Sequence, residues 1–169
     1  MAALTAGTKA PGFSLTGWDG GKFSLQEALL RGPVLAAFFK ISCPVCQYAF
    51  PYFERLYKAH GGGKVSFVAV SQDDASKTRG FLKEYGVTFP TLLDDPNGYA
   101  ASNAYGLTNV PTWFLIGQDG TIELSSVGWS KKDVEELNFR LAEMKAPDGK
   151  EAPLPLFRAG EDVRDFRAG

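Results

Sequence analysis

Residues 34–46 read VLAAFFKISCPVC and combine an apolar run with two closely spaced cysteines. Residues 34–39 form a continuous apolar run of strand length, which is typical of a strand buried on both faces of a mostly parallel sheet. After a short connector come Cys43 and Cys46, separated by two residues. Pro44 suits the first position of a helix, because the N–H that proline lacks would have no partner there. The stretch therefore predicts a strand, a turn that carries two thiols, and a helix.

The chain on either side of this stretch continues the alternation of strands and helices. After the second cysteine, apolar residues at helical spacing predict a helix over 48–57, which Pro51 should kink and the glycines at 61–63 should end. Expected strands further along are 65–70, 91–93, 112–116 and 122–127, and expected helices are 75–85, 99–105 and 131–144. Ser24 and Ser130 are expected to cap the N-termini of the first and last helices.

This order of elements predicts an α/β fold with a central mixed sheet and helices on both of its faces. An N-terminal hairpin is expected over 13–25. We expect one domain over 1–146, followed by an extended or partly disordered tail over 147–169 that packs along the domain. The expected anchors of this tail are Leu156 and Phe157.

Composition restricts the possible partners. The chain has 169 residues, of which 44% are hydrophobic and 22% charged, with a net charge of -1. It has no basic cluster that would attract a phosphate backbone, so nucleic acid is not an expected partner. The run 34–39 is far shorter than the ~20 residues of a membrane helix, and residues 1–9 show no signal-peptide pattern. We therefore expect a cytoplasmic monomer without a membrane partner or a cofactor.

The two cysteines are the only ones in the chain, and a lone close pair is typical of catalytic or redox-sensing thiols. A helix N-terminus stabilises a thiolate through the helix dipole and its free N–H groups. Cys43 is therefore the expected nucleophile in disulfide exchange, and Cys46, one turn later, the expected resolving thiol. The other interpretations are inert cysteines or half of a metal site. Zinc needs four ligands, and the only histidine is His60, so no metal is expected.

Several motifs resemble those of one protein superfamily. Residues 40–46 (KISCPVC) after an apolar strand, and residues 110–112 (VPT) before a later strand, resemble the thioredoxin superfamily. Residues 7–13 (GTKAPGF) and 68–73 (VAVSQD) are similar to its redoxin branch, which includes TlpA-like oxidoreductases and peroxiredoxins. The resemblance covers about residues 7–144. It implies a thioredoxin-like fold and thiol–disulfide oxidoreductase activity.

The resemblance also implies what surrounds the dithiol. Pro111 is expected in the cis form facing the two thiols, with Val110 and Thr112 helping to hold a substrate segment. Pro44 and Val45 are expected to contact substrate and to contribute to the reduction potential. The implied partners are a protein or small-molecule disulfide and a thiol redox partner.

Two carboxylates that members of this superfamily carry near the dithiol are absent. Thioredoxins have an acidic residue at the position of Ala37, and TlpA-like reductases have a glutamate at the position of Ala49. The usual proton acceptor for the buried cysteine is therefore missing. Asp73 or Glu84 is a possible substitute that nothing else in the sequence supports. Lys40 would lower the pKa of a thiolate if its ammonium pointed inward, and would otherwise be a solvated lysine at a strand end.

The expected activity is disulfide exchange in the reducing direction, because a cytoplasmic location favours that direction. Two other functions stay open. A peroxiredoxin-type peroxidase would use Cys46, but Cys43 and Phe39 replace the threonine and proline of that motif. A redoxin module could also bind a metal or a partner without turnover. Copper carriers of this branch have one more residue between their cysteines and a distal histidine.

Overall fold

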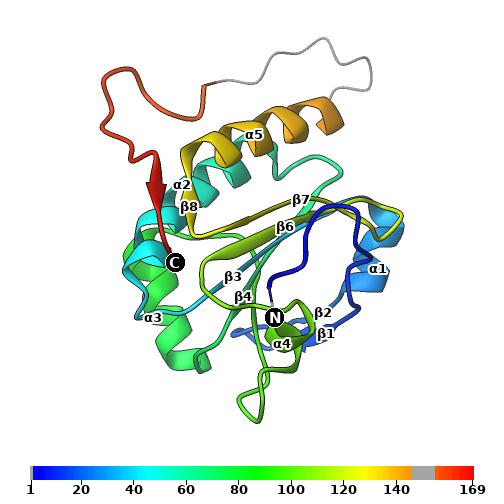
Figure 1. The fold of residues 1–169 in the computed structure, drawn as a ribbon. Helices are drawn as coiled ribbons and strands as arrows, with labels where there is room; N and C mark the ends of the chain where they lie inside the picture. Colours follow the sequence, from blue (N-terminus) through cyan, green and yellow to red (C-terminus); the bar gives the residue numbers. More distant parts are fainter. Residues whose placement is uncertain (1, 146–154) are drawn as a thin grey trace.

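The computed structural model describes residues 2–145 and 155–169, and a five-stranded sheet lies at its centre (Figure 1). The strands are β3 (Val34–Phe39), β4 (Ser66–Ser71), β5 (Thr91–Leu93), β6 (Thr112–Ile116) and β7 (Ile122–Val127). Their order is β5-β4-β3-β6-β7. β4 is parallel to β3 and β5, whereas β6 is antiparallel to β3 and β7. The expected mixed sheet is confirmed, with the apolar run of β3 at its centre.

Helices cover both faces of this sheet. They are α1 (Leu25–Arg31), α2 (Pro44–His60), α3 (Ala75–Tyr85), α4 (Ala100–Ala104) and α5 (Lys131–Lys145). Ser24 and Ser130 are the expected caps: each hydroxyl accepts a backbone N–H three residues on, at 3.4 and 3.2 Å. α2 begins at Pro44 as expected, contains Pro51, and ends three residues later than the apolar pattern indicated. Within 2–145 and 155–169, no helix is long and apolar enough to cross a membrane.

Successive side chains of β3 point to opposite faces of the sheet and contribute to two hydrophobic cores. Leu35, Ala37 and Phe39 face the side covered by α2, α3 and α5. Val34, Ala36 and Phe38 face the side covered by α1, α4 and the hairpin of β1 (Ser14–Thr16) and β2 (Lys22–Ser24). All six side chains are at most 4% exposed. Burial on both faces explains why this strand is a continuous apolar run.

The tail packs along the domain and contains one element that the sequence did not indicate. The boundary that we expect at 146/147 lies outside the described residues, but from residue 155 onward the chain lies against the domain. Leu156 and Phe157 pack on the core, as expected. Further along, β9 (Phe166–Arg167) pairs antiparallel with β8 (Trp129–Ser130), the strand before α5. A ladder of two residues leaves no periodic pattern, so the sequence could not indicate it.

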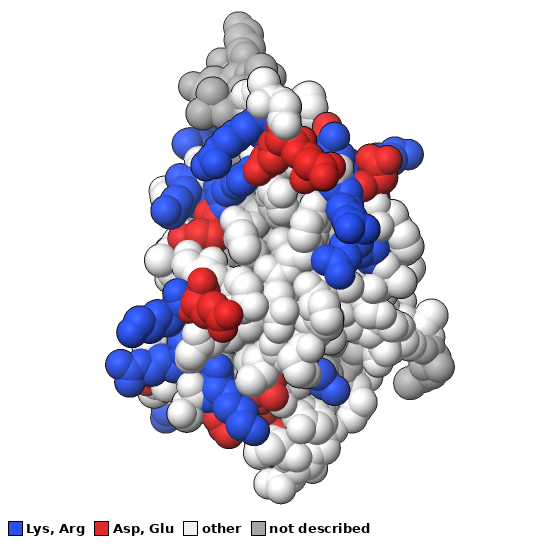
Figure 2. All heavy atoms as spheres, turned by 90° about the vertical axis from the view of Figure 1, so that its left-hand side faces the viewer, with Lys and Arg blue, Asp and Glu red and all other residues white. Residues whose placement is uncertain are grey.

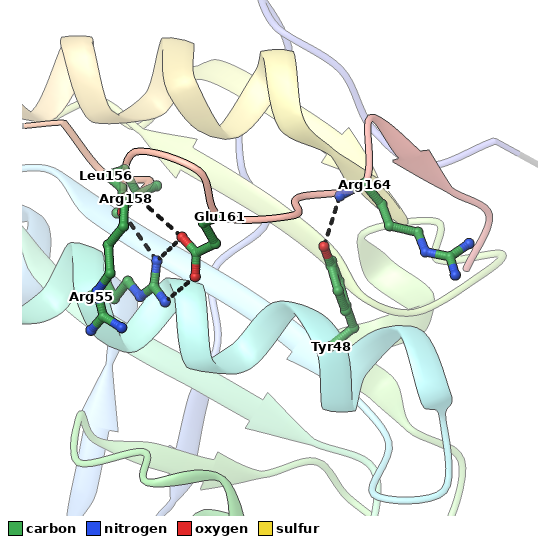
Figure 3. A network of polar contacts seen from close by, with 6 residues as sticks. All are labelled: Tyr48, Arg55, Leu156, Arg158, Glu161 and Arg164. Carbon is green, nitrogen blue, oxygen red and sulfur yellow. Dashed lines mark hydrogen bonds and ion pairs between the residues drawn. The ribbon is translucent and has the colours of Figure 1, made fainter.

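Polar contacts with α2 hold the tail between these two points (Figure 3). The Arg55 guanidinium donates to both carboxylate oxygens of Glu161, at 2.7 and 2.6 Å, and such a bidentate pair fixes orientation as well as charge. The Tyr48 hydroxyl accepts the backbone N–H of Arg164 at 2.9 Å. The Trp129 indole N–H donates to the Arg164 carbonyl at 2.6 Å. The tail is therefore anchored along the helix that carries the two cysteines.

A buried histidine joins the far end of α2 to α5. His60 is the last residue of α2 and 7% exposed, and its Nε2 lies 2.7 Å from Oδ1 of Asn138. Burial lowers the pKa of this imidazole from its usual 6.5; the hydrogen bond with Asn138 opposes that effect, and the charge of Lys145 adds to it. Above pH 6.5 the imidazole is therefore neutral in the folded protein, and it packs at the end of the helix opposite to the cysteines.

We expect His60 to make the fold less stable in mild acid. The unfolded chain binds the proton at the usual pKa of 6.5, and the folded chain binds it only at lower pH. The free energy of unfolding should therefore be undiminished above pH 6.5, fall below that value, and level off once the folded pKa is passed. Each tenfold difference in proton affinity is worth about 1.4 kcal/mol.

Urea unfolding of the wild type and of His60→Gln, at about one pH unit above and one below the usual histidine pKa, measures this effect. The wild type should lose more stability than the variant over that interval. Equal losses in the two proteins would assign the acid sensitivity to other groups.

Candidate active site

The two cysteines lie where β3 ends and α2 begins. This junction of β3 and α2 is on the left-hand side of Figure 1. Cys43 is the N-cap residue of α2 and is half-buried, and its Sγ accepts the backbone N–H of Cys46 at 3.3 Å. Cys46 is 0% exposed. Both cysteines are free thiols. The helix start thus places an accessible sulfur and a buried sulfur one turn apart.

The buried thiol holds its proton firmly. The pKa of Cys46 lies well above the usual 9.0, chiefly because burial removes water from the thiolate. A hydrogen bond from the backbone of Lys40 favours the thiolate, whereas Cys43 and the charge of Asp73 disfavour it. At neutral pH Cys46 is therefore a thiol, and it becomes a nucleophile only when another group takes its proton.

Two side chains fix the connector between β3 and α2. The Asp73 carboxylate accepts the backbone N–H of Ile41 at 2.8 Å, and the Gln47 side-chain amide donates to the Ile41 carbonyl at 2.9 Å. Asp73 follows β4, the parallel neighbour of β3, so both strands end at the same edge of the sheet. The backbone of the preceding residue, Lys40, favours the Cys46 thiolate. The connector that Asp73 fixes is therefore also the segment whose backbone acts on the buried thiol.

A second loop meets the dithiol from the start of β6. The Val110–Pro111 peptide bond is cis, as the resemblance implied. The Cys43 thiol donates to the Val110 carbonyl oxygen at 3.3 Å. Thr112 is fully buried and donates its hydroxyl to the Asn109 carbonyl at 2.7 Å. Thr112 thus supports the loop from inside, and Val110 is the residue that the loop presents to Cys43.

The other residues expected at the site differ in exposure. Pro44 is exposed, whereas Val45 is 8% exposed, so Pro44 is the member of this pair that an incoming molecule can touch. Lys40 is exposed, and its contact with the buried thiol is through its backbone. Of the two possible proton acceptors, Asp73 lies at the dithiol, whereas Glu84 is an exposed residue of α3.

Figure 2 shows this side of the molecule in full. Lys and Arg side chains lie toward its rim, interspersed with Asp and Glu, and the middle of the face is uncharged. No field of a single sign dominates the face, so charge alone would not steer a substrate toward the dithiol.

Together, a thioredoxin-like sheet, two thiols one turn apart at a helix N-terminus, and a cis-proline loop against the outer thiol define a redoxin of the thiol–disulfide oxidoreductase class. Comparison with known proteins agrees with this assignment. Residues 6–125 match the AhpC/TSA family, and the chain belongs to that family.

One relative carries the same activity in its name, and another is named for its likeness to thioredoxin. The chain is 30% identical over 131 residues to the thiol-disulfide oxidoreductase ResA of Bacillus thuringiensis (strain Al Hakam), covering 77% of this chain and 74% of the relative. It is 35% identical over 138 residues to the thioredoxin-like protein YneN of Bacillus subtilis (strain 168), covering 79% and 78%. The chain is thus an oxidoreductase whose class implies disulfide substrates and redox partners.

Solved structures show the same fold. A thiol:disulfide interchange protein of the thioredoxin family from Chlorobium tepidum TLS matches with a TM-score of 0.66 and 27% identity, covering 86% of this chain and 99% of that one. The peroxidoxin BcpB of Mycobacterium tuberculosis also matches with a TM-score of 0.66, covering 83% and 96%. Its identity of 22% makes that a likeness of fold alone.

Proposed function

We propose that this oxidoreductase exchanges disulfides in two steps, with Cys43 as the nucleophile and Cys46 as the resolving thiol. In the first step, the Cys43 thiolate attacks a substrate disulfide, a mixed disulfide forms and one substrate thiolate leaves. In the second step, the Cys46 thiolate attacks Cys43 Sγ, the intramolecular disulfide forms and the second substrate thiolate leaves. The substrate gains two electrons and two protons, and the chain's dithiol is oxidised by the same amount.

The observation that carries this proposal is the difference between the two thiols. Cys43 Sγ is half-buried at the N-cap, whereas Cys46 is 0% exposed and has a raised pKa. An external disulfide can reach only the first sulfur. The second is placed, one turn away, for attack within the molecule.

The second step needs a group that takes the proton of Cys46, and we assign this role to Asp73. Ala37 and Ala49 are both buried in the same core as Cys46 and bear no ionisable group. Asp73 is the carboxylate whose charge acts on Cys46, and it is half-buried, so it can pass a proton to solvent. The proton would move from Cys46 Sγ to the Asp73 carboxylate as Sγ bonds to Cys43.

The same geometry argues against the alternatives. A peroxidase reaction at Cys46 would require a hydroperoxide to reach a sulfur that is 0% exposed. A metal shared between the cysteines and His60 would have to bridge the two ends of α2, a helix of 17 residues that is about 25 Å long. The reducing direction and a cytoplasmic location remain part of this proposal, and the reduction potential tests both.

The reduction potential of the Cys43–Cys46 couple tests the proposal, measured by equilibration with glutathione or dithiothreitol and thiol alkylation. We expect a single two-electron transition near roughly -270 mV, the value of a reductase such as thioredoxin. A value at or above roughly -180 mV would reverse the direction and contradict the cytoplasmic location. Cys46→Ser cannot form the intramolecular disulfide and is the reference for its absence. If the wild type behaved like this variant, the exchange mechanism itself would be wrong.

A further inference from the structure

The tail continues beyond β9 to the loop that faces Cys43. The Asn109 side-chain amide donates to the Gly169 carbonyl at 2.7 Å. A Cβ at Gly169 would collide with the carbonyl oxygen of Val110. That same oxygen accepts the Cys43 thiol at 3.3 Å. The tail and the nucleophile therefore touch one backbone carbonyl from two sides.

A second glycine on the domain receives the tail. Gly128, between β7 and β8, has φ of +75°, and a Cβ there would lie 2.5 Å from the Arg167 carbonyl oxygen and 2.9 Å from the Gly169 nitrogen. These distances are shorter than real Cβ contacts allow. Residues 166–169 are thus pressed between Gly128 and the cis-proline loop, and glycine is required at both contacts.

The end of the tail is held less firmly than its middle. The middle has the bidentate Arg55–Glu161 pair and the hydrogen bond from the buried Trp129 indole to Arg164. The end has a ladder of two residues, the Asn109–Gly169 hydrogen bond and the Arg167 guanidinium 5.2 Å from the centre of the Tyr48 ring, and the side chain of Phe166 is 64% exposed. Because few buried contacts hold residues 166–169, this segment can leave the loop while the rest of the tail stays in place.

Building on the proposed function, we propose that residues 166–169 determine which disulfides reach Cys43. While they are docked, they occupy the side of Val110 along which a polypeptide flanking a disulfide would have to lie. A small disulfide needs only a path to Cys43 Sγ, and the exposed Ser42 and Pro44 leave that path open. The docked segment thus selects small disulfides over polypeptide disulfides.

The fraction of molecules in which residues 166–169 are undocked then sets the rate of reaction with polypeptide disulfides. When only a fraction of the molecules is competent to bind, the apparent affinity is reduced by that fraction. Substitutions that weaken docking by one or two hydrogen bonds should raise kcat/KM for a polypeptide disulfide about tenfold. They should leave kcat/KM for a small disulfide within about twofold, because the cysteines are untouched.

The test compares variants that displace the segment with one that does not. Gly169→Ala places a methyl group against Val110, and Gly128→Asn places a side chain against Arg167 at a positive φ that asparagine tolerates. Gly160→Asn is the matched control, since Gly160 lies in the same tail with φ of +77° and open space around its Cβ position. A fourth protein lacks residues 166–169 and keeps the Arg164 and Asp165 carbonyls that Trp129 and Lys131 bind.

Each protein is assayed with insulin as the polypeptide disulfide and hydroxyethyl disulfide as the small one, with glutathione as the reductant that returns the Cys43–Cys46 disulfide to the dithiol and with the uncatalysed rate subtracted. We expect the ratio of the two kcat/KM values to rise about tenfold in the two displacing variants and in the deletion, and to stay unchanged in Gly160→Asn. An unchanged ratio in the deletion, with normal turnover of the small disulfide, would overturn this inference and leave the proposed function intact. Failure of every protein, wild type included, to reduce hydroxyethyl disulfide would instead contradict the proposed function.

Discussion

Replacing Cys43 by serine is expected to reduce disulfide exchange to the uncatalysed background. A serine hydroxyl is not ionised at neutral pH and is a poor nucleophile without an adjacent base. Cys46 cannot substitute for it, because that sulfur is 0% exposed and keeps its proton. Reaction with dithionitrobenzoate measures the effect, since each attack releases one coloured thiolate. Ser42→Ala, a change at the exposed neighbouring residue, is the matched control and should react like the wild type.

Cys46→Ser should behave differently from Cys43→Ser. Its Cys43 should still attack the reagent, so one thiolate per chain is released and a mixed disulfide remains, which intact mass shows as an adduct. The wild type should release a second thiolate as the intramolecular disulfide forms. If Cys46→Ser stopped all reaction, and Cys43→Ser still consumed hydroperoxide, Cys46 would be the attacking thiol and the peroxidase alternative would replace exchange.

The centre of the fold follows from local sequence, and its edge does not. The run of β3 is apolar at every position because helices cover both faces, so the strand could be recognised from residues 34–39 alone. Pro44 marked the start of α2 for a similarly local reason. The β8–β9 ladder and the Arg55–Glu161 pair join residues far apart in the chain, at positions that carry no periodic pattern. Such contacts depend on tertiary packing and leave no local signal.

The residues of the candidate site also divide into those that the sequence could predict and those that it could not. The two cysteines and the cis-proline are adjacent to strands and carry motifs, so the sequence could name them. The contact between Asp73 and Ile41 depends on two parallel strands ending at one edge, which the motif at 68–73 did not specify. The motifs also did not indicate which residues of the site are exposed. Val45 and Thr112 are buried, although the resemblance implied that they contact substrate. The sequence thus identifies the two sulfurs of the proposed exchange, and the packing identifies their neighbours.

Asp73→Asn is expected to slow the second step of exchange by roughly 10²-fold at neutral pH, at the lower end of what general acid–base catalysis contributes. The amide oxygen of asparagine can still accept the N–H of Ile41, so the connector stays in place. What disappears is the carboxylate that can take the proton of Cys46. The first step, attack by Cys43, should change little. In the dithionitrobenzoate reaction, the first release of thiolate should therefore keep its rate while the second becomes slow.

The pH dependence of that second release separates a proton acceptor from a mere charge. Removing the charge of Asp73 should lower the pKa of Cys46, because that charge disfavours the thiolate. If Asp73 acted only in this way, the variant would resolve faster than the wild type. If Asp73 takes the proton, the variant should be slower despite the lower pKa, and its rate should rise with pH as solvent takes over. Asp74→Asn, at the neighbouring cap of α3, is the control and should leave both releases unchanged.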